Sequence, residues 1–140
     1  MTAKEYLNQY SRLDGNILAN NAELKRLREL SQSPPSVNLS REKVSGGNIS
    51  DRVGGFVSQI VDFEREIEEE NLSFIKKKQE IRERINSIYD EELKLVLKLH
   101  YLNSLNLSRI AEDMSYSYRH VFRIHKNAID TFQKKYGDDF

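Results

Sequence analysis

The residues between Asn106 and Ile129 carry the side chains of this chain that are best suited to hold another macromolecule. Their apolar positions have the spacing of two short helices joined by a tight corner, which is typical of a helix-turn-helix. We predict a first helix from about Leu107 to Met114 and a corner at residues 115–117, with Tyr116 in a core position. Ser117 then begins the second helix, because its hydroxyl can accept a first-turn backbone N–H.

The second helix of this motif has an outward face suited to DNA. Helical periodicity turns Val121, Ile124 and Ala128 inward. The outward positions are Tyr118, Arg119, Phe122, Arg123 and Lys126, and no Asp or Glu occurs from residue 114 to residue 129. Arginine can bond a guanine edge at two points, and Lys or Arg neutralises phosphates, so the major groove accepts such a helix. The sequence therefore predicts double-stranded DNA as a partner.

Other site chemistry is not predicted. The three histidines are His100, His120 and His125; no two of them are four residues apart, and the chain has no Cys. A zinc site is therefore disfavoured, and the imidazoles are expected on the surface or facing the groove. The GGNIS segment at 46–50 lacks the Lys and the strand of a phosphate loop, and no nucleophile elbow occurs. We expect no enzyme, no cofactor and no metal.

Composition sets a condition on DNA binding. The 140 residues contain 22 Lys plus Arg and 22 Asp plus Glu, so the formal net charge is zero. A zero net charge argues against nucleic-acid binding unless the charges are segregated along the chain or a partner contributes to the affinity. Segregation is visible as an acidic run at 62–70 and a basic run at 76–84. The absence of Cys, of a signal peptide and of an apolar run of about 18 residues predicts a soluble, cytoplasmic protein with no membrane partner.

The first part of the chain reads as a helix. Thr2 and Glu5 form a capping box, and apolar residues recur at steps of three and four as far as Leu30. Asn20 occupies one position of this seam, either as a tolerated polar residue, which is the simpler interpretation, or as a device that fixes register. Gly15 costs about 1 kcal/mol relative to Ala, so packing is expected to hold its turn.

A loop at 31–50, with Pro34, Pro35, Gly46 and Gly47, separates this helix from a longer one, and we assign no ligand to the loop. The longer helix is predicted from about Asp51 to Ile88, a length of about 56 Å. We expect the first helix to cover about the first three quarters of it as an antiparallel partner. The remaining C-terminal part needs cover from a second copy or from the C-terminal module. The charge runs are expected to be solvated faces.

The third part completes the predicted architecture. Asp90 is a plausible N-cap for a helix from Glu91 to about Leu102, and the last helix ends near Tyr136 with Gly137 as its C-cap and a short acidic tail behind. The predicted fold class is all-α, with an antiparallel, coiled-coil-like helical hairpin that has a long second helix, followed by a trihelical helix-turn-helix. The predicted domains are 1–88, for oligomerisation or partner binding, and 89–140, for DNA binding.

Residues 90–136, with LKLVLKLHYLNSLNLSRIAEDMSYSYRHVFRIHKNAIDTF, resemble region 4 of sigma-70-type transcription factors. The whole chain, from MTAKEYLNQYSRLD through SDRVGGFVSQIVDFEREI, is similar to small sigma-region-4-like proteins of bacteriophages and integrated mobile elements, including late-gene regulators of the ArpU kind. The resemblance implies base reading by Tyr118, Arg119, Phe122 and Arg123. It also implies backbone contacts from Ser117, Arg109 and Lys126.

Two positions depart from this family pattern. Ser115 stands where Gly is usual, so it must either accept a strained conformation or adjust the turn, at a cost of about 1–2 kcal/mol. Phe122 stands where a polar, base-contacting residue is common in the family. It could contact a thymine methyl group or pack instead against the helix from Glu91 to Leu102.

The resemblance implies a sequence-specific regulator that activates phage late genes with the host RNA polymerase. One neutral chain should bind DNA weakly, so a homodimer formed through the hairpin, or contact with polymerase, is expected to raise affinity. Two alternatives stay open: the small subunit of a phage terminase, which serves DNA packaging, and a protein-binding adaptor whose motif no longer contacts DNA.

Overall fold

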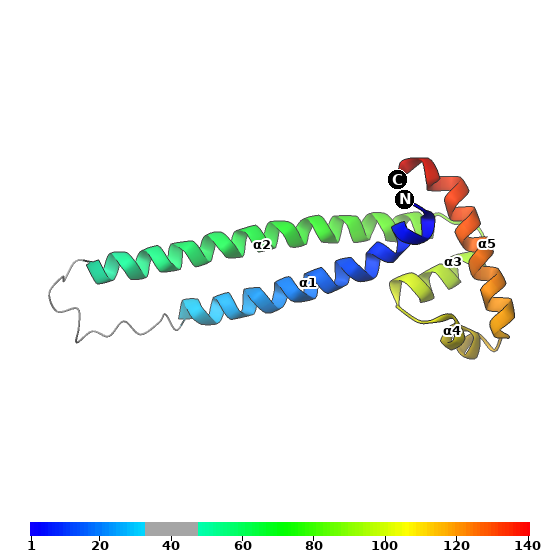
Figure 1. Cartoon of the computed structure of the whole chain (residues 1–140), viewed down its shortest axis with the longest axis horizontal. Helices are drawn as coiled ribbons and strands as arrows, with labels where there is room; N and C mark the ends of the chain where they lie inside the picture. Colours follow the sequence, from blue (N-terminus) through cyan, green and yellow to red (C-terminus); the bar gives the residue numbers. More distant parts are fainter. Residues whose placement is uncertain (33–47) are drawn as a thin grey trace. The chain divides into compact units, whose positions relative to one another are not determined.

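The computed structural model describes residues 1–32 and 48–140, and the side chains from residue 54 onward in the second range. The described part is all-α, which confirms the predicted class, and most of the predicted loop at 31–50 lies outside it (Figure 1). Its elements are α1 (Ala3–Gln32), α2 (Asn48–Asn86), α3 (Glu91–Leu97), a π-helical turn η1 (Lys98–Leu102), α4 (Leu107–Met114), α5 (Tyr118–Tyr136) and a 3₁₀ turn η2 (Gly137–Asp139).

The chain forms two compact units. Unit 1 consists of Met1–Gly15 together with Ile75–Phe140, and unit 2 consists of Asn16–Phe74. The start of α1 and the end of α2 therefore belong to the same unit as the three C-terminal helices. The division into functional modules at 1–88 and 89–140 stays a prediction.

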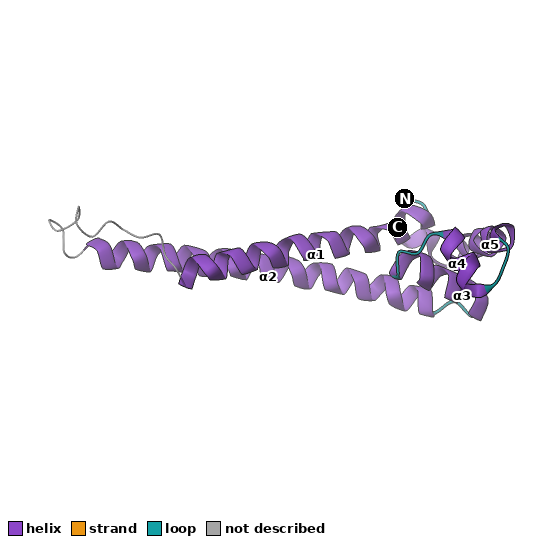
Figure 2. Ribbon diagram, turned by 90° about the horizontal axis from the view of Figure 1, so that it is seen from below, coloured by secondary structure: helices purple, strands orange, loops and turns teal. Residues whose placement is uncertain are grey.

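Within unit 2, a polar network joins α1 to α2, which run antiparallel and side by side (Figures 1 and 2). The Asn20 amide donates to the side chains of Glu70 and Asn71, at 3.0 Å each. Asn71, only 9% exposed, donates in turn to Asn21 at 3.2 Å. Two of these three bonds between the helices involve Asn20, so its amide has partners on α2. This is the geometry that a role of Asn20 in register requires, and that role stays a prediction.

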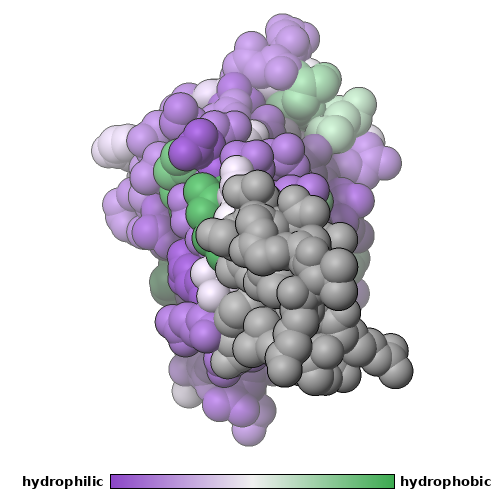
Figure 3. Space-filling model, turned by 90° about the vertical axis from the view of Figure 1, so that its left-hand side faces the viewer, coloured by the Kyte–Doolittle hydropathy of each residue, from purple (hydrophilic) through white to green (hydrophobic). Residues whose placement is uncertain are grey.

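Unit 2 buries few apolar side chains. Leu24 and Ile60 are buried, while Leu18, Phe63 and Leu72 are more than half exposed. The described surface in the view of Figure 3 is mainly hydrophilic, with hydrophobic groups in small patches. Packing of the described side chains in this unit thus rests on a narrow seam.

Unit 1 contains the largest apolar core of the described residues. It joins the beginning of α1, the end of α2 and the C-terminal helices; its buried members are Ala3, Tyr6, Leu7, Tyr10, Ile81, Ile85, Ile88, Leu97, Tyr101, Ala128 and Phe132. The expectation that α1 would leave the C-terminal part of the long helix uncovered is wrong, because α1 begins against that part. Packing under the C-terminal module, one of the two predicted forms of cover, is also present.

The predicted caps are confirmed. The Thr2 backbone N–H donates to the Glu5 carboxylate at 2.7 Å, and the Glu5 N–H donates to the Thr2 hydroxyl at 3.2 Å. Asp90 accepts from the N–H groups of Glu92 and Leu93 at the start of α3. These side chains satisfy donors that a helix N-terminus leaves without partners.

One local expectation needs correction, and the structure adds detail to two others. The helix predicted to run to Leu102 changes at Lys98 into the π-helical turn η1, closed by a 3.0 Å bond from the Asn103 N–H to the Lys98 carbonyl. Gly15 is exposed, and a Cβ there would meet nothing within 4 Å, so no packing contact requires glycine. The acidic tail ends in an apolar contact, because the Phe140 ring stacks on Tyr6 with centroids 4.6 Å apart.

Candidate nucleic-acid interface

A second apolar core in unit 1 holds α4 against α5. Its buried members are Val96, Ile110, Ala111, Val121 and Ile124, with Met114 partly buried beside them. Ala111 is 5% exposed, and its small side chain lets the two helices approach closely. This core fixes which side of α5 faces outward, as the helical periodicity predicted.

The corner between α4 and α5 depends on one residue in an unusual conformation. Ser115 has φ 58° and ψ 37°, the left-handed region that favours glycine. The turn is closed by bonds from the Ser115 N–H to the Glu112 carbonyl at 3.3 Å and from the Tyr116 N–H to the Ala111 carbonyl at 2.9 Å. The Ser117 hydroxyl then caps α5 by accepting the His120 N–H at 3.1 Å. Both predictions, strain at Ser115 and a cap at Ser117, are confirmed.

Tyr116 does not occupy the predicted core position. It is 37% exposed, and its hydroxyl donates to the Glu92 carboxylate at 3.1 Å, a bond that raises the pKa of the phenol. The residue lies between the two helices, where the chain leaves the left-handed corner in an extended path. Helical periodicity therefore does not apply to it, and the assignment from spacing was wrong.

The outward face of α5 carries the predicted base-reading residues. Arg119, Arg123 and Lys126 are exposed, and Tyr118 and Phe122 are 54% and 51% exposed, with ring centroids 6.4 Å apart. Phe122 therefore does not bury its ring against the helix that begins at Glu91. Its side chain is left available on the same face as the arginines.

The charges on this face are unpaired in the described part of the chain. There, neither Arg119, Arg123 nor Lys126 has a carboxylate within 4.0 Å. Arg109 on α4 differs, because its Nε donates to Asp113 at 3.1 Å with both side chains exposed. Five of the predicted contact residues thus form one surface on α5: Tyr118, Arg119, Phe122, Arg123 and Lys126. The other two have partners within the protein, because Arg109 pairs with Asp113 and Ser117 caps α5.

One histidine is buried in unit 1 and a second is partly buried, whereas imidazoles on the surface or facing the groove were expected. His125 is 9% exposed, and its Nε2 lies 2.8 Å from the Tyr101 hydroxyl. Burial, then the neighbouring His100 and then Lys4, lower the pKa of His125 to about 4. Burial also raises the pKa of Tyr101 to about 12. His100 Nδ1 lies 2.7 Å from the Leu105 carbonyl, so that nitrogen carries the proton.

This Tyr101–His125 pair connects η1 to α5 and was not predicted from the sequence. The signal was present, because His125 follows the inward-facing Ile124 and lies four residues after Val121. The surface position expected for His125 follows from the polarity of its side chain, whereas its place in the helical period indicates an inward position. The pair supports the back of α5 and does not reach the outward face.

The described residues contain neither a metal-binding cluster nor a membrane-spanning helix. Across residues 1–32 and 48–140, no group of three or more His, Cys, Asp or Glu side chains could hold a metal ion. In the same part of the chain, no helix is both long and apolar enough to cross a membrane.

Comparison with known proteins adds a family assignment. No curated protein and no solved structure matches the chain. A family model covers residues 33–133, which include α2, α3, α4 and all of α5 except its last three residues. By this match, the chain belongs to the family described as "Protein of unknown function (DUF1492)".

Proposed function

We propose that this protein binds double-stranded DNA through α5 and regulates transcription. The observation that carries the proposal is the exposed, acid-free face of Arg119, Arg123 and Lys126 on a helix held by the core of a helix-turn-helix. Such a helix fits the major groove, where base edges present a pattern that side chains can distinguish.

The geometry suggests a role for each side chain. Arg119 and Arg123 are four residues apart, so they share one side of α5 with a rise of about 6 Å between them. Each is suited to a two-point bond with guanine, while Tyr118 and Phe122 offer apolar contact to thymine methyl groups. Lys126 would neutralise a phosphate farther along the helix.

Arg109 and Ser117 would contact the DNA backbone. Arg109 has to exchange Asp113 for a phosphate, which costs little because an exposed ion pair contributes only about 0–1 kcal/mol. The Ser117 hydroxyl accepts one bond as the helix cap and can still donate its own hydrogen. Arg109 belongs to α4, and Ser117 directly precedes α5.

The class of regulator rests on the resemblance to sigma region 4. We propose a cytoplasmic activator of phage late genes that works with the host RNA polymerase. One α5 offers few cations in a chain of zero net charge, so a second copy or the polymerase is needed for tight binding. The exposed Leu18, Phe63 and Leu72 of unit 2 support a homodimer formed through the hairpin.

Selection from fragmented phage and host DNA tests the proposal. The purified full chain is incubated with the fragments at two salt concentrations, and the retained DNA is sequenced. Arg123→Ala is run beside Arg65→Ala, an exposed arginine of unit 2. We expect fragments upstream of a late operon to be enriched by the unchanged protein and by Arg65→Ala, and lost with Arg123→Ala.

Other results would redirect or contradict the proposal. Enrichment at a packaging region, with a ring-shaped oligomer, would identify a terminase small subunit. Equal recovery of all sequences by Arg123→Ala and the unchanged protein would contradict specific binding by α5. A protein-binding adaptor would enrich no DNA, and its partner would be retained equally by both variants.

A further inference from the structure

A polar hollow of about 300 Å³ lies in unit 1, away from the residues assigned to DNA reading. The end of α2 and the π-helical turn η1 contribute its lining, which consists of Arg82, Asn86, Lys98, Leu102 and Asn103. The lining thus includes two cationic residues, Arg82 and Lys98, and two carboxamide residues, Asn86 and Asn103. No Asp or Glu is among the described residues that line it. Its electrostatic character is therefore that of an anion site.

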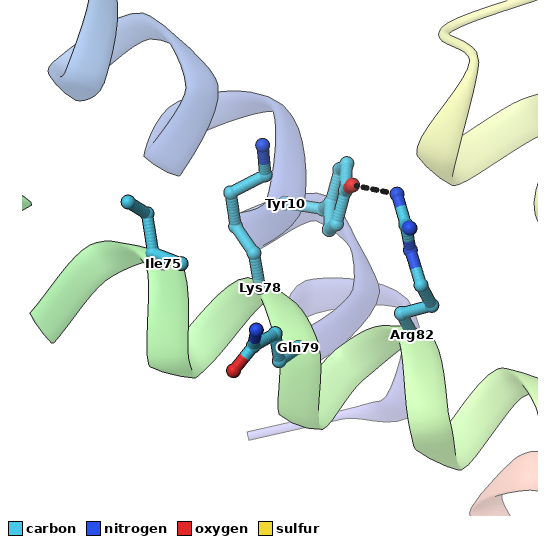
Figure 4. A pocket seen from close by; sticks show the side chains of 5 residues that line it. All are labelled: Tyr10, Ile75, Lys78, Gln79 and Arg82. Atoms are coloured by element: carbon cyan, nitrogen blue, oxygen red, sulfur yellow. Dashed lines mark hydrogen bonds between the residues drawn. The ribbon is translucent and has the colours of Figure 1, made fainter. Parts of the chain in front are cut away.

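Arg82 is held by a neutral hydrogen-bond partner, so its positive charge is not compensated by that partner. Its Nη2 donates to the Tyr10 hydroxyl at 3.2 Å, a neutral partner that orients the guanidinium. Figure 4 shows this bond in another pocket, which Arg82 lines together with Tyr10 and Lys78. Lys78, one turn earlier on α2, is by contrast paired with the Asp14 carboxylate. In the described part of the chain, Arg82 has no carboxylate within 4.0 Å. The positive charge of Arg82 is thus available to a ligand, whereas that of Lys78 is already compensated.

The π-helical turn η1 brings the side chains of Lys98 and Asn103 to the same hollow. Residues five apart in an α-helix point about 140° away from each other. In η1 the Asn103 N–H bonds to the Lys98 carbonyl at 3.0 Å, so the two ends of the five-residue turn meet. The same hollow therefore receives both Lys98 and Asn103, while Arg82 and Asn86, four residues apart, share one face of α2. Turns of this kind are frequent at functional sites.

The donor set matches a phosphate group. Guanidinium and ammonium groups form the stronger, charge-assisted bonds to phosphate oxygens, and each carboxamide adds N–H donors. These four groups offer more donors than a carboxylate can accept, and the volume exceeds that of a phosphate ion alone. The geometry points to a site for a phosphate ester, in which Arg82 and Lys98 neutralise the charge and Asn86 and Asn103 orient the oxygens. This assignment does not rest on DNA binding by α5.

Two sources supply this chemistry, a backbone phosphate of a DNA duplex and a free phosphate monoester. The test uses ¹⁵N-labelled full-length protein and follows the side-chain amides of Asn86 and Asn103 by NMR. Inorganic phosphate is titrated at constant ionic strength, with chloride alone as the reference. We expect saturable shifts of both amides with phosphate and not with chloride.

Three variants make the test specific. Arg82→Gln and Lys98→Gln each remove one charge-assisted bond, so each should weaken phosphate binding about tenfold. Lys76→Gln removes an exposed cation of α2 outside the hollow and should change binding less than twofold. Unchanged spectra elsewhere show that each variant is folded. Shifts that grow without saturation, or an equal loss in all three variants, would overturn the assignment.

A second titration identifies the source. A short duplex without terminal phosphates that shifts the same amides and competes with inorganic phosphate indicates a backbone phosphate. A duplex that leaves those amides unshifted, while phosphate still shifts them, indicates a free phosphate monoester. Loss of duplex binding in Arg119→Ala with phosphate binding unchanged would separate this site from the one proposed on α5.

Discussion

At the scale of single residues, His125 has the most constrained environment of the three histidines. It is buried beside Tyr101 and His100, and its pKa is lowered to about 4 because the charged form loses hydration there. The imidazole is therefore neutral at pH 7 and bonds to the Tyr101 hydroxyl. Protonation would place a charge on the inner side of α5, next to His100 and near Lys4.

This environment predicts acid sensitivity. Above pH 6.5 His125 is neutral in both the folded and the unfolded chain; below it the unfolded chain binds a proton that the folded chain does not. The free energy of unfolding should thus fall between pH 6.5 and about 4, by at most about 1.4 kcal/mol per pH unit. Urea denaturation at pH 7 and pH 5 measures the loss, which His125→Gln should reduce by roughly 1–2 kcal/mol. An equal reduction in His120→Gln, a half-exposed control, would refute the assignment.

Gly15 gives a second prediction at this scale. It lies inside α1, and nothing stands within 4 Å of a Cβ placed there. Gly15→Ala should raise the free energy of unfolding by about 1 kcal/mol, because alanine restricts the unfolded chain and favours the helix. Gly137→Ala is the matched comparison, since its Cβ would meet the Gln133 side chain that accepts the Ala3 N–H. Thermal unfolding of both variants tests this, and destabilisation by Gly15→Ala would show that the glycine is required.

At the scale of elements, the hairpin depends on the polar contact that Asn20 and Asn71 make between α1 and α2. Their amides are 3.0 Å apart, and Asn71 also bonds to Asn21. A buried amide that loses its partner costs about 1–3 kcal/mol, whereas replacing both partners by apolar groups can be nearly neutral. The pair therefore resembles the single asparagines that fix register in coiled coils at some cost in stability.

A double-mutant cycle tests this role. Asn71→Leu and Asn20→Leu should each destabilise the protein by about 1–2 kcal/mol, and the double variant should recover most of that loss. The double variant should also have a less specific register between α1 and α2. Cysteines introduced on the two helices would detect this as additional cross-links. Additive losses with an unchanged cross-linking pattern would show that the asparagines do not act as a pair.

The same scale shows where sequence patterns were sufficient. The bounds of α4, the caps at Thr2, Asp90 and Ser117, and the strained corner at Ser115 follow from local chemistry, so they could be predicted. The π-helical turn could not, because a one-residue change in hydrogen-bond register leaves the apolar spacing almost intact. Tyr116 was misplaced because helical periodicity was extended through a corner that is not helical.

At the scale of the whole molecule, the predicted hairpin and C-terminal helices are present, but the contribution of α1 to the largest core of the described residues was not predicted. Tyr6, Ile85 and Phe132 come from the beginning, the middle and the end of the chain and are buried in one cluster. Each reads as part of a local amphipathic seam, so nothing in the pattern shows that the seams join. The outward face of α5 was predicted correctly because it depends only on the period of one helix. The hollow near Arg82 depends on contacts between distant segments and was not predicted.

Binding of a selected duplex as a function of salt tests the central proposal most directly. The unchanged protein is compared with Arg119→Ala/Arg123→Ala and with Arg26→Ala/Arg65→Ala, a control that removes the same charge from exposed positions of unit 2. We predict that the α5 variant loses about 1–3 kcal/mol of binding free energy per arginine and its preference for the selected sequence, while the control keeps both. Equal affinity and sequence preference in the two variants would contradict DNA reading by α5.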